Sequence, residues 1–259
     1  METEVLLKYL GAKIKDFQSL KAIITKINKL DQNPFEDLDK IRANIKKLEK
    51  ILRLEEKDEI YQSISEWLKE YKTKERQYSE ELKKRFGIEF EKELKQCDLL
   101  LTGHYPKFKV WMFVIEVNVD KFTATIWYGP KQEKLESSSL IPSKIAKRLA
   151  EIKNKLGSKI DKDELFEKLK EAYIEVSQQF KQKEVPILEV KKEFSLLLQK
   201  EKYSRADFSY DLFRLKDNKN LKLRVAARAY TKTRKDFLWI PSNEKGEGYV
   251  YSHIQIEVN

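Results

Sequence analysis

The chain has 259 residues, of which 53 are Lys or Arg and 43 are Asp or Glu, so its formal net charge is +10. Charged residues make up 37% of it, against roughly 25% in ordinary soluble proteins, while 41% are hydrophobic, enough for a core. No stretch has the roughly 18 apolar residues of a membrane span, and the single cysteine, Cys97, excludes an internal disulfide. The N-terminal residues lack the basic-then-apolar order of a signal peptide. We therefore expect a cytoplasmic, folded protein with no membrane partner.

The first hundred residues predict helix. They hold 22 Lys and Arg against 21 Asp and Glu, and only two glycines and one proline interrupt them. Apolar residues from Leu7 to Ile27 recur at steps of three and four, which places them on one stripe of a helix over about residues 3–30. The turn formers at 31–34 then predict a reversal of the chain.

A second apolar stripe keeps heptad spacing over residues 38–52 and resumes, after a phase shift, over residues 60–86. A straight helix over 35–86 would be about 75 to 80 Å long at 1.5 Å per residue. Such a length favours a coiled-coil arm over residues 1–97. The arm is expected to form a homodimer or to bind a protein partner, unless its helices pack only on each other.

Residues 98–158 predict a small antiparallel β region with a helix. Three segments have strand length and aromatic or branched side chains, which indicates a three-stranded meander: residues 107–115, 122–128 and 132–135. Three strands alone are marginally stable, so we expect a helix over about 143–156, or the end of the arm, to cover them. The three serines at 137–139 are the expected surface connection.

Residues 159–259 predict three helices followed by strands. The helices are expected over about 162–182, from Pro186 onward, and after Ser204, which can cap its helix together with Asp207 three positions on. Strand-like alternation then follows in three segments, at residues 221–230, 237–240 and 249–258.

Helix, helix, short turn, helix and a basic two-stranded ribbon is the element order of winged-helix domains, and residues 163–259 resemble that broad family. The resemblance implies that the helix from Arg205 to Lys216 enters the major groove of duplex DNA while the hairpin tip contacts the backbone. Residues 200–236 hold 12 Lys and Arg against 5 Asp and Glu, which suits phosphate binding. The DNA-binding residues so implied are Arg205, Ser209, Arg214 and Lys216 on the helix and Lys232, Arg234 and Lys235 at the tip.

Two carboxylates weigh against sequence-specific reading of the groove, because Asp207 and Asp211 place negative charge on the candidate recognition helix. Winged helices also serve as protein-interaction modules. We therefore predict an α+β, non-catalytic nucleic-acid-binding protein with duplex DNA as the favoured partner. The alternative is a coiled-coil adaptor whose winged helix binds protein.

A more remote alternative is a Mg²⁺-dependent nuclease. Asp98 and Glu116 resemble the acidic pair of restriction-endonuclease-type nucleases, in which two carboxylates hold the metal. That family has Lys two residues after the second acid, and Asn118 stands at this position here. The chain's two histidines and one cysteine supply at most three soft ligands, and no glycine-rich phosphate loop occurs. We expect no metal site and no cofactor.

Overall fold

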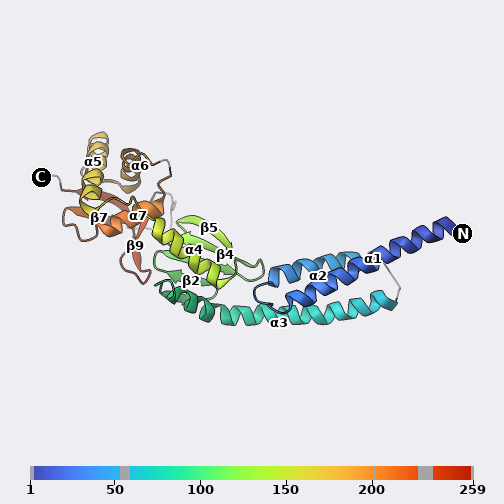
Figure 1. The fold of residues 1–259 in the computed structure, drawn as a ribbon. Helices are drawn as coiled ribbons and strands as arrows, with labels where there is room; N and C mark the ends of the chain where they lie inside the picture. Colours follow the sequence, from blue (N-terminus) through green and yellow to red (C-terminus); the bar gives the residue numbers. More distant parts are fainter. Residues whose placement is uncertain (1–2, 53–58, 201, 227–235, 258–259) are drawn as a thin grey trace. The chain divides into compact units, whose positions relative to one another are not determined.

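The computed structural model of the chain, drawn in Figure 1, describes residues 3–52, 59–200, 202–226 and 236–257. It combines helices with antiparallel sheets, so the predicted α+β class is confirmed at that level. The chain divides into two compact units, one made of Met1–Phe86 with Asn118–Phe122 and the other of Gly87–Val117 with Thr123–Asn259. Among the described helices, none combines the length and the apolar character that crossing a bilayer requires.

The first unit consists mainly of helices. They are α1 (Thr3–Leu30), α2 (Leu38–Leu52) and α3 (Glu59–Lys95). Only the part of α3 up to Phe86 belongs to this unit. The helix predicted over residues 3–30 is confirmed. The straight helix predicted over 35–86 is wrong, because Lys72 of α3 donates to Glu49 of α2 at 2.5 Å, whereas a straight helix would separate them by about 35 Å. The chain reverses between α2 and α3.

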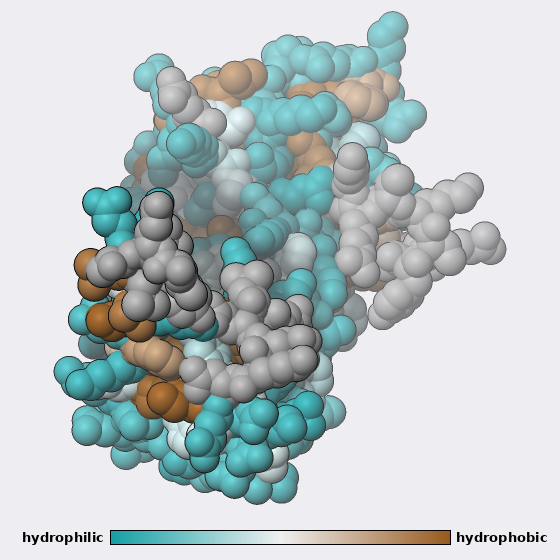
Figure 2. Space-filling view, turned by 90° about the vertical axis from the view of Figure 1, so that its right-hand side faces the viewer, coloured by the Kyte–Doolittle hydropathy of each residue, from teal (hydrophilic) through white to brown (hydrophobic). Residues whose placement is uncertain are grey.

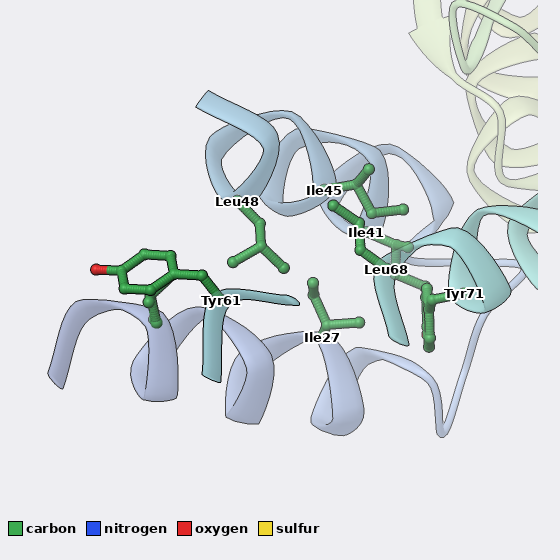
Figure 3. Packing of buried hydrophobic residues seen from close by; sticks show 8 residues of the cluster. Ile27, Ile41, Ile45, Leu48, Tyr61, Leu68 and Tyr71 are labelled. Atoms are coloured by element: carbon green, nitrogen blue, oxygen red, sulfur yellow. The ribbon is translucent and has the colours of Figure 1, made fainter. Parts of the chain in front are cut away.

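The apolar stripes of the three helices meet in one core, shown in Figure 3. Its buried members are Leu20 and Ile27 of α1, Ile41, Ile45 and Leu48 of α2, and Tyr61, Leu68 and Tyr71 of α3. Fully burying one such aliphatic side chain contributes about 1.5 to 3 kcal/mol. This gain explains why α2 and α3 fold against α1, and the phase shift in the stripe lies at the point where the chain reverses.

The turn after α1 is held by Asp31. Its carboxylate accepts hydrogen bonds from the hydroxyl groups of Tyr71 at 2.7 Å and Tyr78 at 2.8 Å, and from the ammonium group of Lys74. Burial by itself would raise the pKa of Asp31, but these three donors on α3 outweigh it and lower the pKa below its ordinary value. The ionised carboxylate therefore stabilises the contact between the turn and α3.

Replacing Asp31 by Asn is expected to destabilise the first unit by about 2 kcal/mol at pH 7, since hydrogen bonds to a charged group are lost. Because the folded-state pKa is lowered, this contribution is present above the unfolded value of about 4 and disappears as the pH falls through the folded value. Urea unfolding followed by circular dichroism at neutral and acidic pH measures it. Glu36→Gln, at an exposed position, is the control, and an equal loss at both pH values would contradict the assignment.

The second unit contains a five-stranded antiparallel sheet in the order β1-β2-β3-β4-β5. Its strands are β1 (Leu101–His104), β2 (Lys107–Val110), β3 (Phe113–Asn118), β4 (Thr123–Tyr128) and β5 (Glu133–Ser139). The predicted meander therefore has two strands more than expected. The three serines at 137–139 are not a connection but the end of β5, because an edge strand needs few apolar side chains. Helix α4 (Pro142–Lys155) packs against β5 and agrees with the helix predicted there.

The C-terminal part of this unit alternates helices with a second sheet. Its elements are α5 (Lys162–Phe180), β6 (Val185–Pro186), α6 (Ile187–Leu197), α7 (Arg205–Arg214), β7 (Leu221–Val225), β8 (Leu238–Pro241) and β9 (Gly248–Ile256). Strand β9 lies between β6 and β7, and its first half also pairs with β8. The three predicted helices are thus present, and the short strand β6 was not foreseen.

Candidate nucleic-acid interface

Helix α7, the candidate recognition helix, begins with the predicted cap. The Ser204 hydroxyl accepts a hydrogen bond from the Asp207 backbone N–H at 3.1 Å, and the Asp207 carboxylate accepts one from the Ser204 N–H at 2.9 Å. This reciprocal capping box satisfies two donors at the helix start. It places Arg205 in the first turn of α7.

The two carboxylates on α7 face the protein interior. Asp207 accepts a hydrogen bond from the Gly157 N–H at 2.9 Å, and Asp211 accepts one from the Ser158 N–H at 2.7 Å. Gly157 has φ of +82°, and a Cβ there would lie 2.6 Å from an Asp211 carboxylate oxygen, so only glycine fits. Asp207 and Asp211 therefore anchor the connection between α4 and α5. Both carboxylates lie on α7, as expected, and that they weigh against sequence-specific reading of the groove stays a prediction.

Asp211 also organises the far end of α7. It is 1% exposed and accepts hydrogen bonds from the hydroxyl of Tyr203 at 2.5 Å and from Arg214 at 3.2 Å. Arg214 donates a further bond to the Ile160 carbonyl at 2.6 Å. Burial raises the pKa of Tyr203, and the charge of Asp211 acts in the same direction, so the hydroxyl stays a donor. Arg214, predicted to contact DNA, is thus engaged in holding α7 to its neighbours.

Ser209 is completely buried, so the prediction that it lies on the exposed side of the helix is wrong. Its hydroxyl donates to the backbone carbonyl of Trp239 in β8 at 2.9 Å, and the Tyr128 hydroxyl donates to the same oxygen. A buried hydroxyl needs such a partner, since leaving it unpaired would cost about 1 to 3 kcal/mol. Ser209 therefore joins α7 to β8 and to the large sheet.

The large sheet covers another side of α7. Trp111, between β2 and β3, packs edge-on against Tyr210 at 5.6 Å and against Phe213 at 6.0 Å between ring centroids. Every residue of α7 is consequently buried or half-buried. A helix that reads the major groove needs a free face, so the insertion of α7 expected from the family resemblance does not agree with this packing. Lys216 follows the helix, is exposed, and lies 4.7 Å from the Phe213 ring.

Arg205 is the predicted residue that the structure places at an open site. With Lys191 and Lys192 of α6 it lines a surface pocket of about 340 Å³ at the junction of α6 and α7. Pro186, Leu188, Glu189 and Asp236 complete the lining. Lys192 is paired with Glu189 at 2.6 Å, which neutralises one of the carboxylates. We name this set of residues the α6–α7 pocket.

Lys191 contributes a cation to the α6–α7 pocket. It is half-buried, lies 5.8 Å from the centre of the Tyr203 ring, and is in no ion pair within the described part of the chain. Burial lowers the pKa of Lys191, and the charge of Arg205 lowers it further, while Glu133 and Asp207 act in the opposite direction. An anion bound here would therefore relieve the unfavourable burial of a cation.

The sequence did not indicate Lys191 and Lys192 as nucleic-acid contacts, because the pattern over α6 showed only an apolar face. Pairing their charges with Arg205 depends on how α6 and α7 pack, which no local pattern reports. The predicted hairpin residues Lys232, Arg234 and Lys235 lie outside the described residues. In sequence they stand directly before Asp236, which is part of the α6–α7 pocket.

The two carboxylates of the remote nuclease alternative lie in different surroundings. Glu116 at the middle of β3 interacts with Lys131 at 3.1 Å and with Lys107 at 3.9 Å. Asp98 is exposed and follows α3 with φ of +52°. Within residues 3–52, 59–200, 202–226 and 236–257, no three His, Cys, Asp or Glu side chains are grouped so as to hold a metal ion.

Comparison of the chain with protein-family models, with curated proteins and with solved structures gives no match.

Proposed function

We propose that this chain is a non-catalytic nucleic-acid-binding protein whose C-terminal region, over α5 to β9, is a winged-helix domain. The observation that carries the proposal is the half-buried ammonium group of Lys191, which lies beside Arg205 in the α6–α7 pocket and has no carboxylate partner among the described residues. Phosphate groups of duplex DNA are the favoured ligands. The contact is to the nucleic-acid backbone, which Lys and Arg bind without reading the sequence.

The strand order supports the winged-helix assignment. Winged-helix domains insert a short strand after their first helix and pair it with the last strand of the hairpin, and here β6 pairs with β9, which in turn pairs with β7. The order here is α5, β6, α6, α7, β7, β8, β9, which follows that scheme with β8 as an additional strand that pairs with β9. The proposed mode of binding differs from insertion of the third helix into the major groove, because α7 is covered. The start of α7 and the adjoining turn of α6 form the contact instead.

The charge distribution supports an anionic partner. Residues 101–259 carry 31 Lys and Arg against 22 Asp and Glu, which accounts for +9 of the net charge of +10. A charge surplus of this kind attracts polyanions over a distance of about one Debye length, near 10 Å at 0.1 M salt.

Binding to duplex DNA is expected to depend strongly on salt. Two phosphate contacts, by Lys191 and Arg205, predict a slope of log affinity against log salt of at least about −1.8, hence at least a roughly tenfold loss between 50 and 200 mM. Fluorescence anisotropy of the full chain with labelled duplexes of unrelated sequence measures this slope. Absence of binding at 50 mM salt would overturn the proposal, and a clear preference for single strands would contradict the duplex assignment.

A second function, binding of a protein partner through the N-terminal arm, is favoured by one observation on the first unit. Leu7, Leu10 and Ile14 of α1 are 63%, 46% and 58% exposed, so the apolar stripe continues beyond the part covered by the core. We propose that this stripe binds a protein surface, in addition to the nucleic-acid contact of the second unit.

A further inference from the structure

The exposed part of α1 combines an apolar stripe with positive charge. Figure 2 shows hydrophobic residues gathered in patches on an otherwise hydrophilic face, and the exposed large hydrophobic residues among the described side chains of α1 are Leu7, Leu10 and Ile14. Lys8 and Lys15, each next to one of them in sequence, are exposed as well. An apolar stripe with lysines along its edge is suited to bind an apolar surface that is bordered by carboxylates.

The same chain carries such a surface between α5 and α6. A groove of about 650 Å³ contains the apolar side chains of Ile174 and Leu197. Its lining includes five glutamates, Glu164, Glu167, Glu171, Glu175 and Glu193, against the two lysines Lys168 and Lys170. We name this site the α5–α6 groove.

The glutamates of the α5–α6 groove are only partly neutralised. Lys168 pairs with Glu164 at 3.7 Å and Lys170 with Glu167 at 3.5 Å. Glu171 and Glu193 take part in no ion pair among the described residues. Carboxylates four positions apart on α5 repel one another, so an added cation at the rim would be favourable.

The α5–α6 groove is long enough to hold the apolar stripe of α1. From Glu164 to Glu175 the groove follows α5 for about 16 Å, and the stripe from Leu7 to Ile14 covers about 10 Å of α1 at 1.5 Å per residue. A helix laid between two packed helices completes a three-helix arrangement. In that arrangement Leu7, Leu10 and Ile14 would meet the apolar floor.

We infer that α1 of one copy of this chain docks in the α5–α6 groove of a second copy. Lys8 and Lys15 then face Glu171 and Glu193, while the apolar stripe leaves water. The contact joins unlike surfaces, so each copy offers both a helix and a groove. This inference is independent of nucleic-acid binding, because it uses neither the α6–α7 pocket nor the charges around it.

Sedimentation velocity of the full chain without nucleic acid tests the inference. The average mass is expected to rise above the monomer value of 30.9 kDa between about 5 and 200 µM, where a contact of one helix should assemble. The double variants Lys8→Glu with Lys15→Glu, and Glu171→Lys with Glu193→Lys, should each weaken association at least about tenfold. Mixing the two variants should restore it, because the unchanged helix of the groove variant then meets the unchanged groove of the helix variant, and the reversed helix meets the reversed groove.

Matched controls keep the result interpretable. Lys21→Glu with Lys26→Glu changes exposed lysines of α1 away from the stripe, and Glu66→Lys with Glu70→Lys changes exposed glutamates of α3; both should associate as the unmodified chain does. Circular dichroism confirms folding of every variant. A groove variant that still associates normally would overturn the inference in favour of helix-to-helix pairing of α1. A chain that stays monomeric throughout the series would overturn it as well.

Discussion

Replacing Lys191 and Arg205 by glutamine together is expected to lower the affinity of the chain for duplex DNA roughly 50-fold at 0.1 M salt. Each phosphate contact contributes about 0.9 to the slope of log affinity against log salt concentration. At 0.1 M salt, losing one contact therefore lowers the affinity by about 0.9 log units. The slope should therefore become shallower by about 1.8. Glutamine removes the charges without placing a new carboxylate beside Glu133, which accepts from the Arg205 backbone N–H at 3.1 Å.

The control for this experiment is a variant with the same change in net charge. Lys162 and Lys183 lie in the same unit, are exposed and stand outside the α6–α7 pocket, so their replacement by glutamine should leave the slope nearly unchanged. Anisotropy titrations at several salt concentrations give both quantities. Equal losses in the two double variants would mean that diffuse charge, and not the α6–α7 pocket, attracts the nucleic acid.

Replacing Asp211 by alanine is expected to destabilise the second unit by about 3 to 5 kcal/mol, because removing one member of a buried charged network leaves the other members buried without a partner. The Ser158 N–H, the Tyr203 hydroxyl and Arg214 would each lose an acceptor. For a unit of this size, such a loss lowers the midpoint of thermal unfolding by roughly 10 °C. The Asp211→Asn variant keeps one acceptor oxygen, so its midpoint of thermal unfolding should lie between those of the unmodified chain and the Asp211→Ala variant.

Thermal unfolding followed by circular dichroism measures this effect, with Asp217→Ala as the control. Asp217 is exposed and follows α7 by three residues, so its replacement should change stability by no more than about 0.5 kcal/mol. Comparable melting of the Asp211 and Asp217 variants would show that the carboxylate of Asp211 does not hold the connection between α4 and α5.

These two experiments separate two roles within one helix. Asp211, Arg214 and Ser209 bind α7 to the connection before α5 and to β8. Arg205 alone among the predicted residues of α7 reaches an open pocket. A charge change at Arg205 should therefore weaken binding, whereas a change at Asp211 should mainly affect stability.

Much of the local structure could be predicted from the sequence. The apolar stripe of α1, the cap formed by Ser204 with Asp207, and the helices of the C-terminal region follow from spacing and from the chemistry of helix ends, which involve residues a few positions apart. The division into residues 1–97, 98–158 and 159–259 stays a prediction.

Properties that depend on contacts between distant segments are visible only in the folded chain. Most of the helices and the positive charge of residues 101–259 follow from the sequence alone. The sequence could not tell that Asp207, Asp211 and Arg214 face inward, because their partners lie about fifty positions earlier in the chain. Nor could it place Lys191 beside Arg205, since the packing of α6 on α7 creates that pocket. The charge of a side chain follows from the residue type, whereas the direction in which the side chain points is set by the packing of the whole unit.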